Sequence, residues 1–400
     1  MTGDTSLRQK IKDLHDESAI EFAAGELTRS LDLSRKALDL ADSNGFGEDA
    51  AHNRWHVGTT LVHLEKLREG MAALAPLLQL NSALEDRGGQ PKATAFSKTV
   101  RVISYESGPF EVLLSAYIVF VGAALQIPVS LSSIESVLQQ VERLVTEPEY
   151  GYYRAMVLRT RADLASLRGM HKAALNVLQE AISIKSDERS LLSRVAECHL
   201  KMGDLASAQK YFERWDGAEE ENSALDVCWS LDVRSRLASR GDDKHHALEI
   251  ARELRTQVDY VVAPRLRRGA LRTLFDALLA VDELARARSE LLELATLRHT
   301  ESKMNRYDIV LLCAHYHARA AKAHRVEGAE RGPDAGISGK KDEGVVGHSS
   351  RKEFHKARAM YTMALRLATD IEDLLNCNWR QEDIRGRLRA IGDAELGSQA

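Results

Sequence analysis

Residues 161–182 read RADLASLRGMHKAALNVLQEAI, and the stretch that begins 34 positions later reads VAECHLKMGDLASAQKYFERWD. In each, a glycine, Gly169 or Gly203, divides two runs whose apolar residues recur three or four positions apart. That spacing places the apolar residues on one face of an α-helix. Each stretch therefore predicts two short helices, the first of which ends at a glycine in the left-handed conformation. The equivalent positions are Ala162 and Ala196, Ala165 and His199, Gly169 and Gly203, Ala174 and Ala208, Leu178 and Phe212, and Ala181 and Trp215.

The same pattern can be followed along most of the chain. It predicts helical hairpins over 11–41, 51–80 and 115–146, then the two quoted stretches, then hairpins that begin near Val227, Arg268 and Leu311. Small residues let the two helices of a hairpin approach, and larger apolar residues fill the space beside the crossing. The hairpin that begins near Val227 is degenerate, because Arg234 takes a position where a small residue is usual. Residues 371–391 are expected to form a final, charged capping helix.

A period of 34 residues built from two helices resembles the tetratricopeptide repeat family. The resemblance covers most of the chain and is strongest over 158–215. It implies an all-α fold, a right-handed α-solenoid of about eight hairpins with a C-terminal capping helix. In such a solenoid each repeat contacts only its neighbours, and the last one needs a polar cap.

Two stretches interrupt the pattern and suggest a division of the chain into five segments. Glycine, proline and charge are concentrated near 86–91 and 107–109, and again over 331–350. We expect the second stretch to form a disordered loop between two helices of one hairpin. The predicted segments are N-terminal repeats over 1–80, an irregular insertion over 81–110, central repeats over 111–325, a disordered loop over 326–353, and the last repeat helix with the capping helix over 354–400.

The composition favours a soluble protein of the cytoplasm. Hydrophobic residues make up 44% of the chain, and its formal net charge of −4 disfavours nucleic acid as a partner. The four cysteines lie far apart without a CxxC pair, which is typical of a reduced, intracellular protein. The apolar run over 112–125 is followed by Gln126 and Pro128, so we predict a buried helix rather than a membrane span.

No motif in the chain makes a convincing catalytic, cofactor or metal site. Residues 336–341 read GISGKK and echo a phosphate-binding loop, but the first glycine and the Ser or Thr after the lysine are missing. Cys313, His315, His317 and His324 do not share one helix face as ligands would. We expect these groups, and His52, His56 and His63, to pack or to face solvent. We therefore expect no enzymatic activity, no cofactor and no metal.

The resemblance implies a non-catalytic scaffold or adaptor that holds a protein or peptide in its concave groove, with membership of a larger complex left open. In the family, exposed residues of each first helix line that groove. Both signs of charge occur there, which favours a partner of mixed polarity. The implied partner-binding residues are Arg159, Asp163, Ser193, Glu197, Lys201, Arg272, Asp276, Arg319 and Lys322.

The chain departs from two known subfamilies of this family, and two further functions are compatible with its sequence. The clamp that grips chaperone C-termini needs asparagines where this chain has Asp163 and Glu197. The bacterial peptide-sensing regulators share the architecture, but we expect no helix-turn-helix before the repeats, which disfavours direct control of transcription. A peptide-sensing or inhibitory regulator, and an accessory subunit of an enzyme complex, remain as alternatives. The basic residues Arg267 and Arg268 are expected to pair with nearby acids rather than with phosphate.

Overall fold

The chain is entirely helical wherever regular structure is described. The computed structural model describes residues 2–85, 109–127, 131–186, 188–216, 224–259, 264–297, 303–330, 342–375 and 377–396. Within these ranges no residue belongs to a strand. The predicted all-α class is therefore confirmed.

In the described ranges, sixteen helices form eight antiparallel hairpins, and one more helix follows them. A short 3₁₀ turn at Pro148–Tyr150 precedes α7. The number of hairpins and the additional final helix agree with the predicted tetratricopeptide-like solenoid. The pairs are α1 (Thr2–Ala23) with α2 (Leu27–Ser43), α3 (Gly47–His63) with α4 (Leu67–Glu85), α5 (Pro109–Ala124) with α6 (Leu131–Leu144), α7 (Gly151–Leu167) with α8 (His171–Ile184), α9 (Arg189–Met202) with α10 (Leu205–Asp216), α11 (Ala224–Arg240) with α12 (Lys244–Asp259), α13 (Pro264–Ala280) with α14 (Leu284–Thr296), and α15 (Lys303–Glu330) with α16 (Asp342–Leu375), followed by α17 (Trp379–Leu396).

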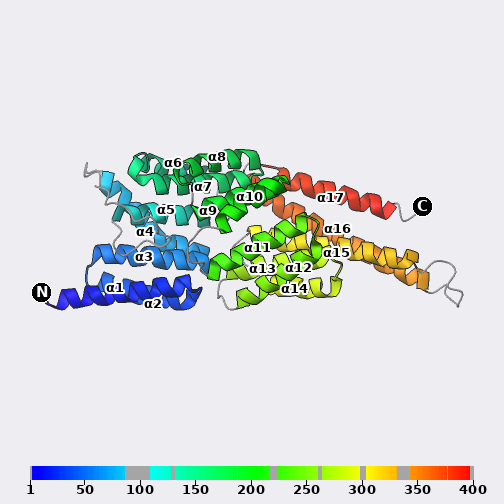
Figure 1. The fold of residues 1–400 in the computed structure, drawn as a ribbon, viewed down its shortest axis with the longest axis horizontal. Coiled ribbons are helices and arrows are strands. Elements are labelled where there is room, and N and C mark those ends of the chain that lie inside the picture. The colour runs from blue at the N-terminus through cyan, green and yellow to red at the C-terminus, as the bar shows by residue number, and fades with distance from the viewer. Residues whose placement is uncertain are drawn as a thin grey trace.

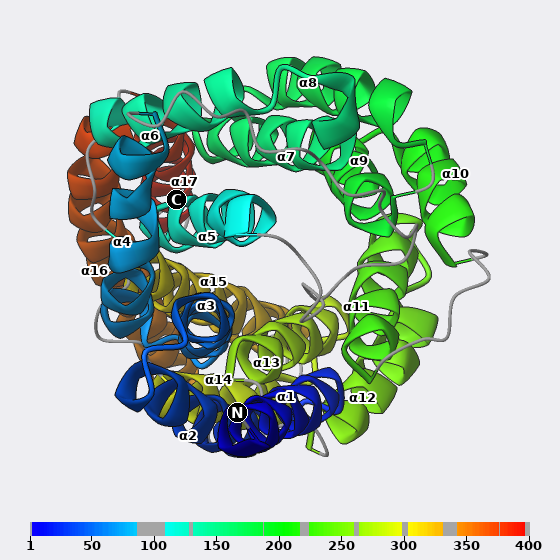
Figure 2. The same ribbon diagram turned by 90° about the vertical axis from the view of Figure 1, so that its left-hand side faces the viewer.

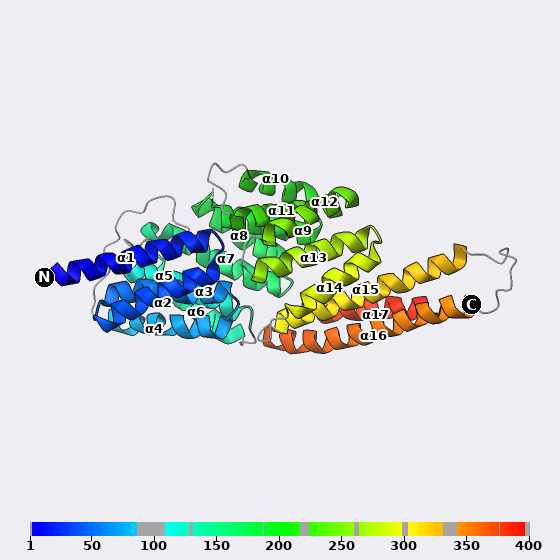
Figure 3. The same ribbon diagram turned by 90° about the horizontal axis from the view of Figure 1, so that it is seen from below.

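The hairpins are stacked into a superhelix with an inner and an outer layer. The two ends of the chain lie at opposite ends of its longest dimension (Figure 1 and Figure 3). Seen along that dimension, the helices run around a ring, with α7, α9, α11 and α13 on its inner side and α8, α10 and α12 on its outer side (Figure 2). The first helix of each central hairpin thus faces the interior of the superhelix.

Small residues at the helix crossings set the shape of each hairpin. Ala162 and Ala196 are 1% and 0% exposed, as expected for residues between two close helices. In the second hairpin Gly58 and Gly70 take this role, since a Cβ at Gly70 would lie 2.7 Å from Cγ2 of Val62 and 3.0 Å from the carbonyl oxygen of Gly58. Helices α3 and α4 can approach this closely only because both positions lack a side chain.

The register predicted for the sixth hairpin was wrong by one residue. Ser235, which is 1% exposed and donates a hydrogen bond to the carbonyl of Ala247 at 2.9 Å, occupies the position between the helices. Arg234 instead points toward α10 and pairs with Asp216 at 2.5 Å. The turn residue Asp242 follows Gly203 by 39 positions, five more than the period of 34, so the register of α11 could not be carried over from α9.

Helix also extends further than composition predicted near the C-terminus. Helix α15 runs to Glu330 and α16 begins at Asp342, so both enter the range 326–353 that was expected to be a loop. Ser350 on α16 donates to the carbonyl of Ala321 on α15 at 3.1 Å, and such contacts between paired helices are invisible to composition. The predicted final helix over 371–391 is divided, because α16 ends at Leu375 and α17 begins at Trp379. Residues 86–108 and the GISGKK stretch at 336–341 lie outside the described residues.

Hairpins that are far apart in the sequence contact each other and close the superhelix. Arg268 on α13 forms an ion pair with Glu65, which lies in the turn between α3 and α4 with its side chain 5% exposed. Around this pair, buried side chains of the first two hairpins and of α11–α13 form one apolar cluster. At the other end, the indole nitrogen of Trp379 donates to the carbonyl of Leu167 at 3.0 Å, and its ring lies against Gly169.

Candidate functional site

Two rows of polar side chains run along the inner helices α7, α9, α11 and α13. Their positions follow from the turns, because Gly169, Gly203, Asp242 and Asp282 all have a left-handed φ of 63–80° and therefore mark the same point of each hairpin. Residues four apart on a helix share a face, so the two rows lie side by side. The proximal row, six residues before each turn residue, is Asp163, Glu197, Arg236 and Asp276, and the distal row, ten residues before it, is Arg159, Ser193, Asp232 and Arg272.

Ion pairs connect the rows between α7, α9 and α11. Arg194 reaches Asp163 at 3.1 Å and Glu197 at 2.8 Å, and so joins α7 to α9. Glu197 is also 3.4 Å from Lys201 and 3.9 Å from Arg236 on α11. One carboxylate on α9 is therefore shared by three cations from two helices.

The connections continue between α11, α13 and α15. Arg236 lies 3.2 Å from Asp232 on its own helix. Thr273 on α13 donates to Asp232 at 2.5 Å, and Arg272 lies 3.4 Å from Asp308 on α15. Ion pairs, together with the hydrogen bond from Thr273 to Asp232, thus link side chains of α7, α9, α11, α13 and α15.

These side chains are partly open to solvent although helices surround them. The side chains of Arg194 and Glu197 are 29% and 23% exposed. Burial by the neighbouring helices opposes the ionisation of Glu197, but Lys201, Arg194 and Arg236 outweigh it and lower the pKa of that carboxyl. A side chain on a concave surface can contact solvent and still be surrounded by neighbouring helices, which accounts for both observations on Glu197.

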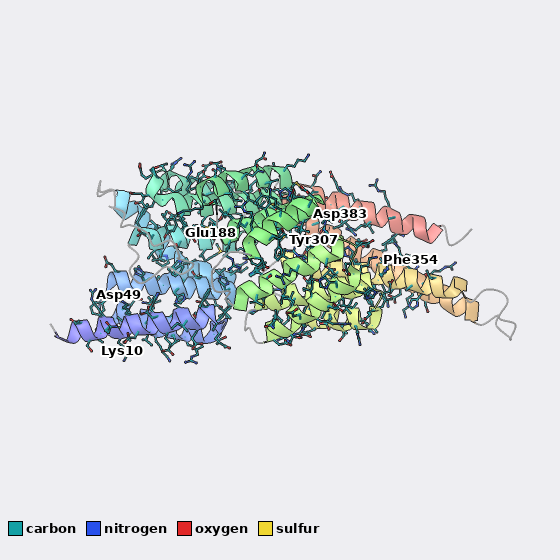
Figure 4. All side chains as sticks on the ribbon, viewed as in Figure 1. Lys10, Asp49, Glu188, Tyr307, Phe354 and Asp383 are labelled. Carbon is teal, nitrogen blue, oxygen red and sulfur yellow. The ribbon has the colours of Figure 1, made fainter. Side chains whose placement is uncertain are left out.

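Charged side chains of α17 lie close enough to α15 to affect the pKa of two of its residues. Tyr307 is near the start of α15 and Asp383 near the start of α17 (Figure 4). Burial is the main cause that raises the pKa of Tyr307 to about 12, while Arg380 lowers it and Asp308 and Asp383 raise it. Burial likewise lowers the pKa of His315 to about 4, and Arg387 on α17 and Arg272 on α13 contribute.

The structure brings most of the predicted partner-binding residues together. Asp163, Glu197, Lys201 and Arg272 form the ion pairs described above, and Asp276 lies near enough to Arg272 and Asp232 for their charges to affect its pKa. Arg159 occupies the distal row on α7, where it is half-buried. Ser193 is in the same row, but its hydroxyl donates to the carbonyl of Ser190 on its own helix at 3.1 Å.

Two predicted residues lie elsewhere. Arg319 forms a bidentate ion pair with the turn residue Asp282, at 2.6 and 2.7 Å, and therefore lies at the turn end of α13 and α14. Lys322, three residues further along α15, is exposed. Helix α15 has 28 residues, and the assignment of these two side chains to partner binding stays a prediction.

The predicted set of partner-binding residues lacks four residues that form ion pairs on the inner surface: Arg194, Asp232, Arg236 and Asp308. The positions of Asp232 and Arg236 could have been counted back from the turn residue Asp242. An aspartate, however, does not mark a left-handed turn as reliably as a glycine does. Arg267 and Arg268 do pair with acids as expected, namely with Glu293 at 2.7 Å and with Glu65.

A second polar cluster is buried between the first two hairpins. Nδ1 of His56 lies 3.1 Å from the hydroxyls of both Ser18 and Ser34. A serine within reach of a histidine is the arrangement of a nucleophile and its base. However, Ser18 and Ser34 are 0% exposed and His56 is 1% exposed, so no substrate can reach them. Burial, followed by the neighbouring His15 and His63, lowers the pKa of His56 to about 3, so this ring is neutral at physiological pH.

The histidines and cysteines near the C-terminus do not assemble a metal site in the described part of the chain. Nδ1 of His317 lies 2.5 Å from Glu353, which also accepts from Lys356 at 2.6 Å. Among the described residues, no three His, Cys, Asp or Glu side chains are arranged to hold a metal ion.

The four thiols of Cys198, Cys228, Cys313 and Cys377 are not joined in disulfides. In the same described residues, no helix combines the length and the apolar character that a bilayer span requires.

Comparison with known proteins shows similarity of fold alone. No protein-family model matches the chain, and no curated protein matches it in sequence. A solved Rap protein in complex with competence and sporulation factor is 12% identical, with a TM-score of 0.48, over 88% of this chain and all of that one.

Two further structures with this type of fold have lower TM-scores. A tetratricopeptide repeat protein from Parabacteroides merdae is 12% identical over 92% of this chain and 98% of that one, with a TM-score of 0.38. The human IFIT1 dimer with PPP-AAAA is 11% identical over 96% of this chain and 94% of that one, with a TM-score of 0.40. The likeness concerns how helical hairpins are stacked, and it assigns no partner.

Proposed function

We propose that this chain is a non-catalytic scaffold or adaptor that binds a protein or peptide along the inner surface of its superhelix. The observation that carries the proposal is the pair of inner rows, in which charged side chains from successive helices are ordered by mutual ion pairs yet remain open to solvent. Solvent-exposed ion pairs contribute little to stability. Their regular arrangement is therefore better explained by recognition, because complementary charges determine partner choice and the rate of association.

Both signs of charge occur in each row, and this favours a polypeptide over a nucleic acid. A surface that binds phosphates presents Lys and Arg without interspersed carboxylates. Here Asp163, Glu197, Asp232 and Asp276 separate the basic side chains. A peptide chain carries both charges and backbone groups that can pair with both.

Affinity capture with two charge-reversed variants tests the proposal. Arg159→Glu combined with Arg272→Glu reverses the two basic ends of the distal row. The matched control reverses two outer cations, Lys244 and Arg286, whose side chains are 49% and 68% exposed. Both variants should retain the helical signal and a stability within about 1 kcal/mol of the parent, because all four side chains lie outside the core.

Proteins captured by the parent and by the control, but lost from the inner variant, would support binding along the rows. A stoichiometric protein partner favours the scaffold, whereas a short peptide that raises the melting temperature favours a peptide-sensing regulator. Equal capture by all three proteins contradicts the proposal. Capture of RNA that depends on the two inner arginines would replace the peptide partner by a nucleic acid.

A further inference from the structure

The inner surface between α11 and α15 carries one carboxylate more than its cations balance. Asp232 and Asp308 are each within ion-pair distance of a guanidinium, at 3.2 Å from Arg236 and at 3.4 Å from Arg272. Asp276 lies between them in the proximal row and is exposed. Among the described residues, Asp276 forms no hydrogen bond and no ion pair within 4.0 Å. The two guanidiniums thus pair with Asp232 and Asp308, and the third carboxylate, that of Asp276, is left unpaired and accessible to solvent.

The surroundings of Asp276 disfavour an unpaired negative charge. Burial by the adjacent helices, together with the like charges of Asp232 and Asp308, raises the pKa of Asp276 to about 6, although Arg272 and Arg236 oppose the change. A positive group brought to this carboxylate would remove the unfavourable interaction. The position thus has the electrostatics of an anchor for a cation.

An aromatic side chain is exposed on the same surface. Trp229 on α11 lies seven residues before Arg236 and therefore shares its helix face. Its side chain is 36% exposed, which is unusual for tryptophan in this chain outside α17, since Trp55 and Trp215 are 6% and 3% exposed. The equivalent position on α13 is Gly269, where an added Cβ would meet no atom within 4 Å. The inner surface therefore offers an apolar face next to open space.

The distance between Asp276 and Trp229 is one that an extended peptide can span. Seven residues correspond to about 10 Å along a helix axis. Neighbouring helices are about 8–10 Å apart, so the diagonal from Trp229 to Asp276 is roughly 13 Å. An extended chain covers this in about four residues, and residues an even number apart point to the same side.

We propose that the partner on the inner surface is an extended polypeptide segment that places a Lys or Arg side chain on Asp276 and an apolar side chain on Trp229, about four residues apart. This inference rests on the proposed function and specifies its partner. Charge complementarity supports it, because the segment supplies the cation that this part of the surface lacks. Trp229 contributes a large contact area of the kind that dominates binding energies.

Selection from a phage-displayed library of random linear peptides tests the inference. The library is panned against the parent, Asp276→Asn, Trp229→Ala and a control, Glu249→Gln, whose side chain is 76% exposed on the outer helix α12. The parent and the control should enrich peptides with a basic and an apolar residue at the stated spacing. Asp276→Asn should lose the basic preference, and Trp229→Ala the apolar one.

Binding of the most enriched peptide, made synthetically, gives the quantitative result. Asp276→Asn should weaken it about tenfold or more, as the loss of a charge-assisted hydrogen bond does. Replacing the basic residue of the peptide by methionine should have the same effect, and the two changes together should add little. A peptide with Glu at that position should bind Asp276→Lys better than it binds the parent. Binding to the parent should also weaken as the pH falls through about 6, and this dependence should vanish in Asp276→Asn.

The outcomes separate this inference from the proposed function. Enriched peptides without a basic residue, whose binding is nevertheless lost in Arg159→Glu/Arg272→Glu, would overturn the inference and leave binding along the rows intact. The inference is also wrong if Asp276→Asn and Glu249→Gln bind the enriched peptide equally. If no peptide prefers the parent over the doubly reversed variant, peptide binding along the rows fails as well.

Discussion

Replacement of Gly169 by alanine tests whether α17 closes the superhelix against the turn between α7 and α8. Gly169 and Gly203 have nearly the same φ, 78° and 80°. An added Cβ at Gly203 would meet no atom within 4 Å, whereas at Gly169 it would lie 2.5 Å from Cδ1 and 2.6 Å from Cγ of Trp379. The two glycines thus form a matched pair that differs only in the indole.

The expected costs follow from these distances. Alanine in the left-handed region costs about 1–2 kcal/mol, so Gly203→Ala should lose about that much stability. Gly169→Ala should lose about 1–3 kcal/mol more, because the indole must move and its hydrogen bond to Leu167 is strained. The measurement is urea unfolding followed by far-UV circular dichroism.

The Trp379→Ala background supplies the control. Without the indole, Gly169→Ala should cost no more than Gly203→Ala, which gives a coupling of about 1–3 kcal/mol between the two sites. Equal costs of the two alanine substitutions in the parent would refute the reasoning, since the contact between α17 and the turn would then not exist in solution.

Three further predictions concern packing, charge and pH. Ala196→Leu should overpack the crossing of α9 and lower stability by about 1–3 kcal/mol, and a thermal melt like that of the parent would contradict the register. Arg268→Met should cost about 3–5 kcal/mol in urea unfolding, because it leaves the carboxylate of Glu65 buried without its guanidinium, and the neighbouring Arg267→Met, whose ion pair is exposed, should cost less than about 1 kcal/mol. The pKa of His56 is lowered from 6.5 to about 3, so between pH 6.5 and about pH 3 this ring is protonated in the unfolded chain but not in the folded protein. The stabilisation that comes from keeping His56 neutral is therefore complete above pH 6.5 and is lost as the pH falls below it. The loss should reach about 2 kcal/mol at pH 5 and be absent in His56→Gln, and an equal slope of stability against pH in both proteins would disprove it.

The inner surface could be read from the sequence where the turn residue is glycine. Gly169 and Gly203 fixed the positions of Asp163 and Glu197, which the structure places in the proximal row. Where aspartate takes the left-handed turn, the result was mixed: Arg272 and Asp276 before Asp282 were predicted, but Asp232 and Arg236 before Asp242 were missed. Arg319 lies at the turn end of α13 and α14, because α15 is longer than the other first helices.

The sequence by itself determined the local structure of this protein, because helical hairpins are specified by residues close together in the chain. Periodic apolar positions, small residues at crossings and glycine turns are all interactions within about one repeat. Only the tertiary structure decided how the superhelix closes. The ion pair of Arg268 with Glu65 and the contact of Trp379 with Gly169 join hairpins that are far apart in the sequence. Both contacts depend on how every intervening hairpin is rotated relative to the one before it. That Asp276 has no ion-pair partner among the described residues is of the same kind, because it depends on where Arg236 of α11 and Arg272 of α13 point once the helices are packed.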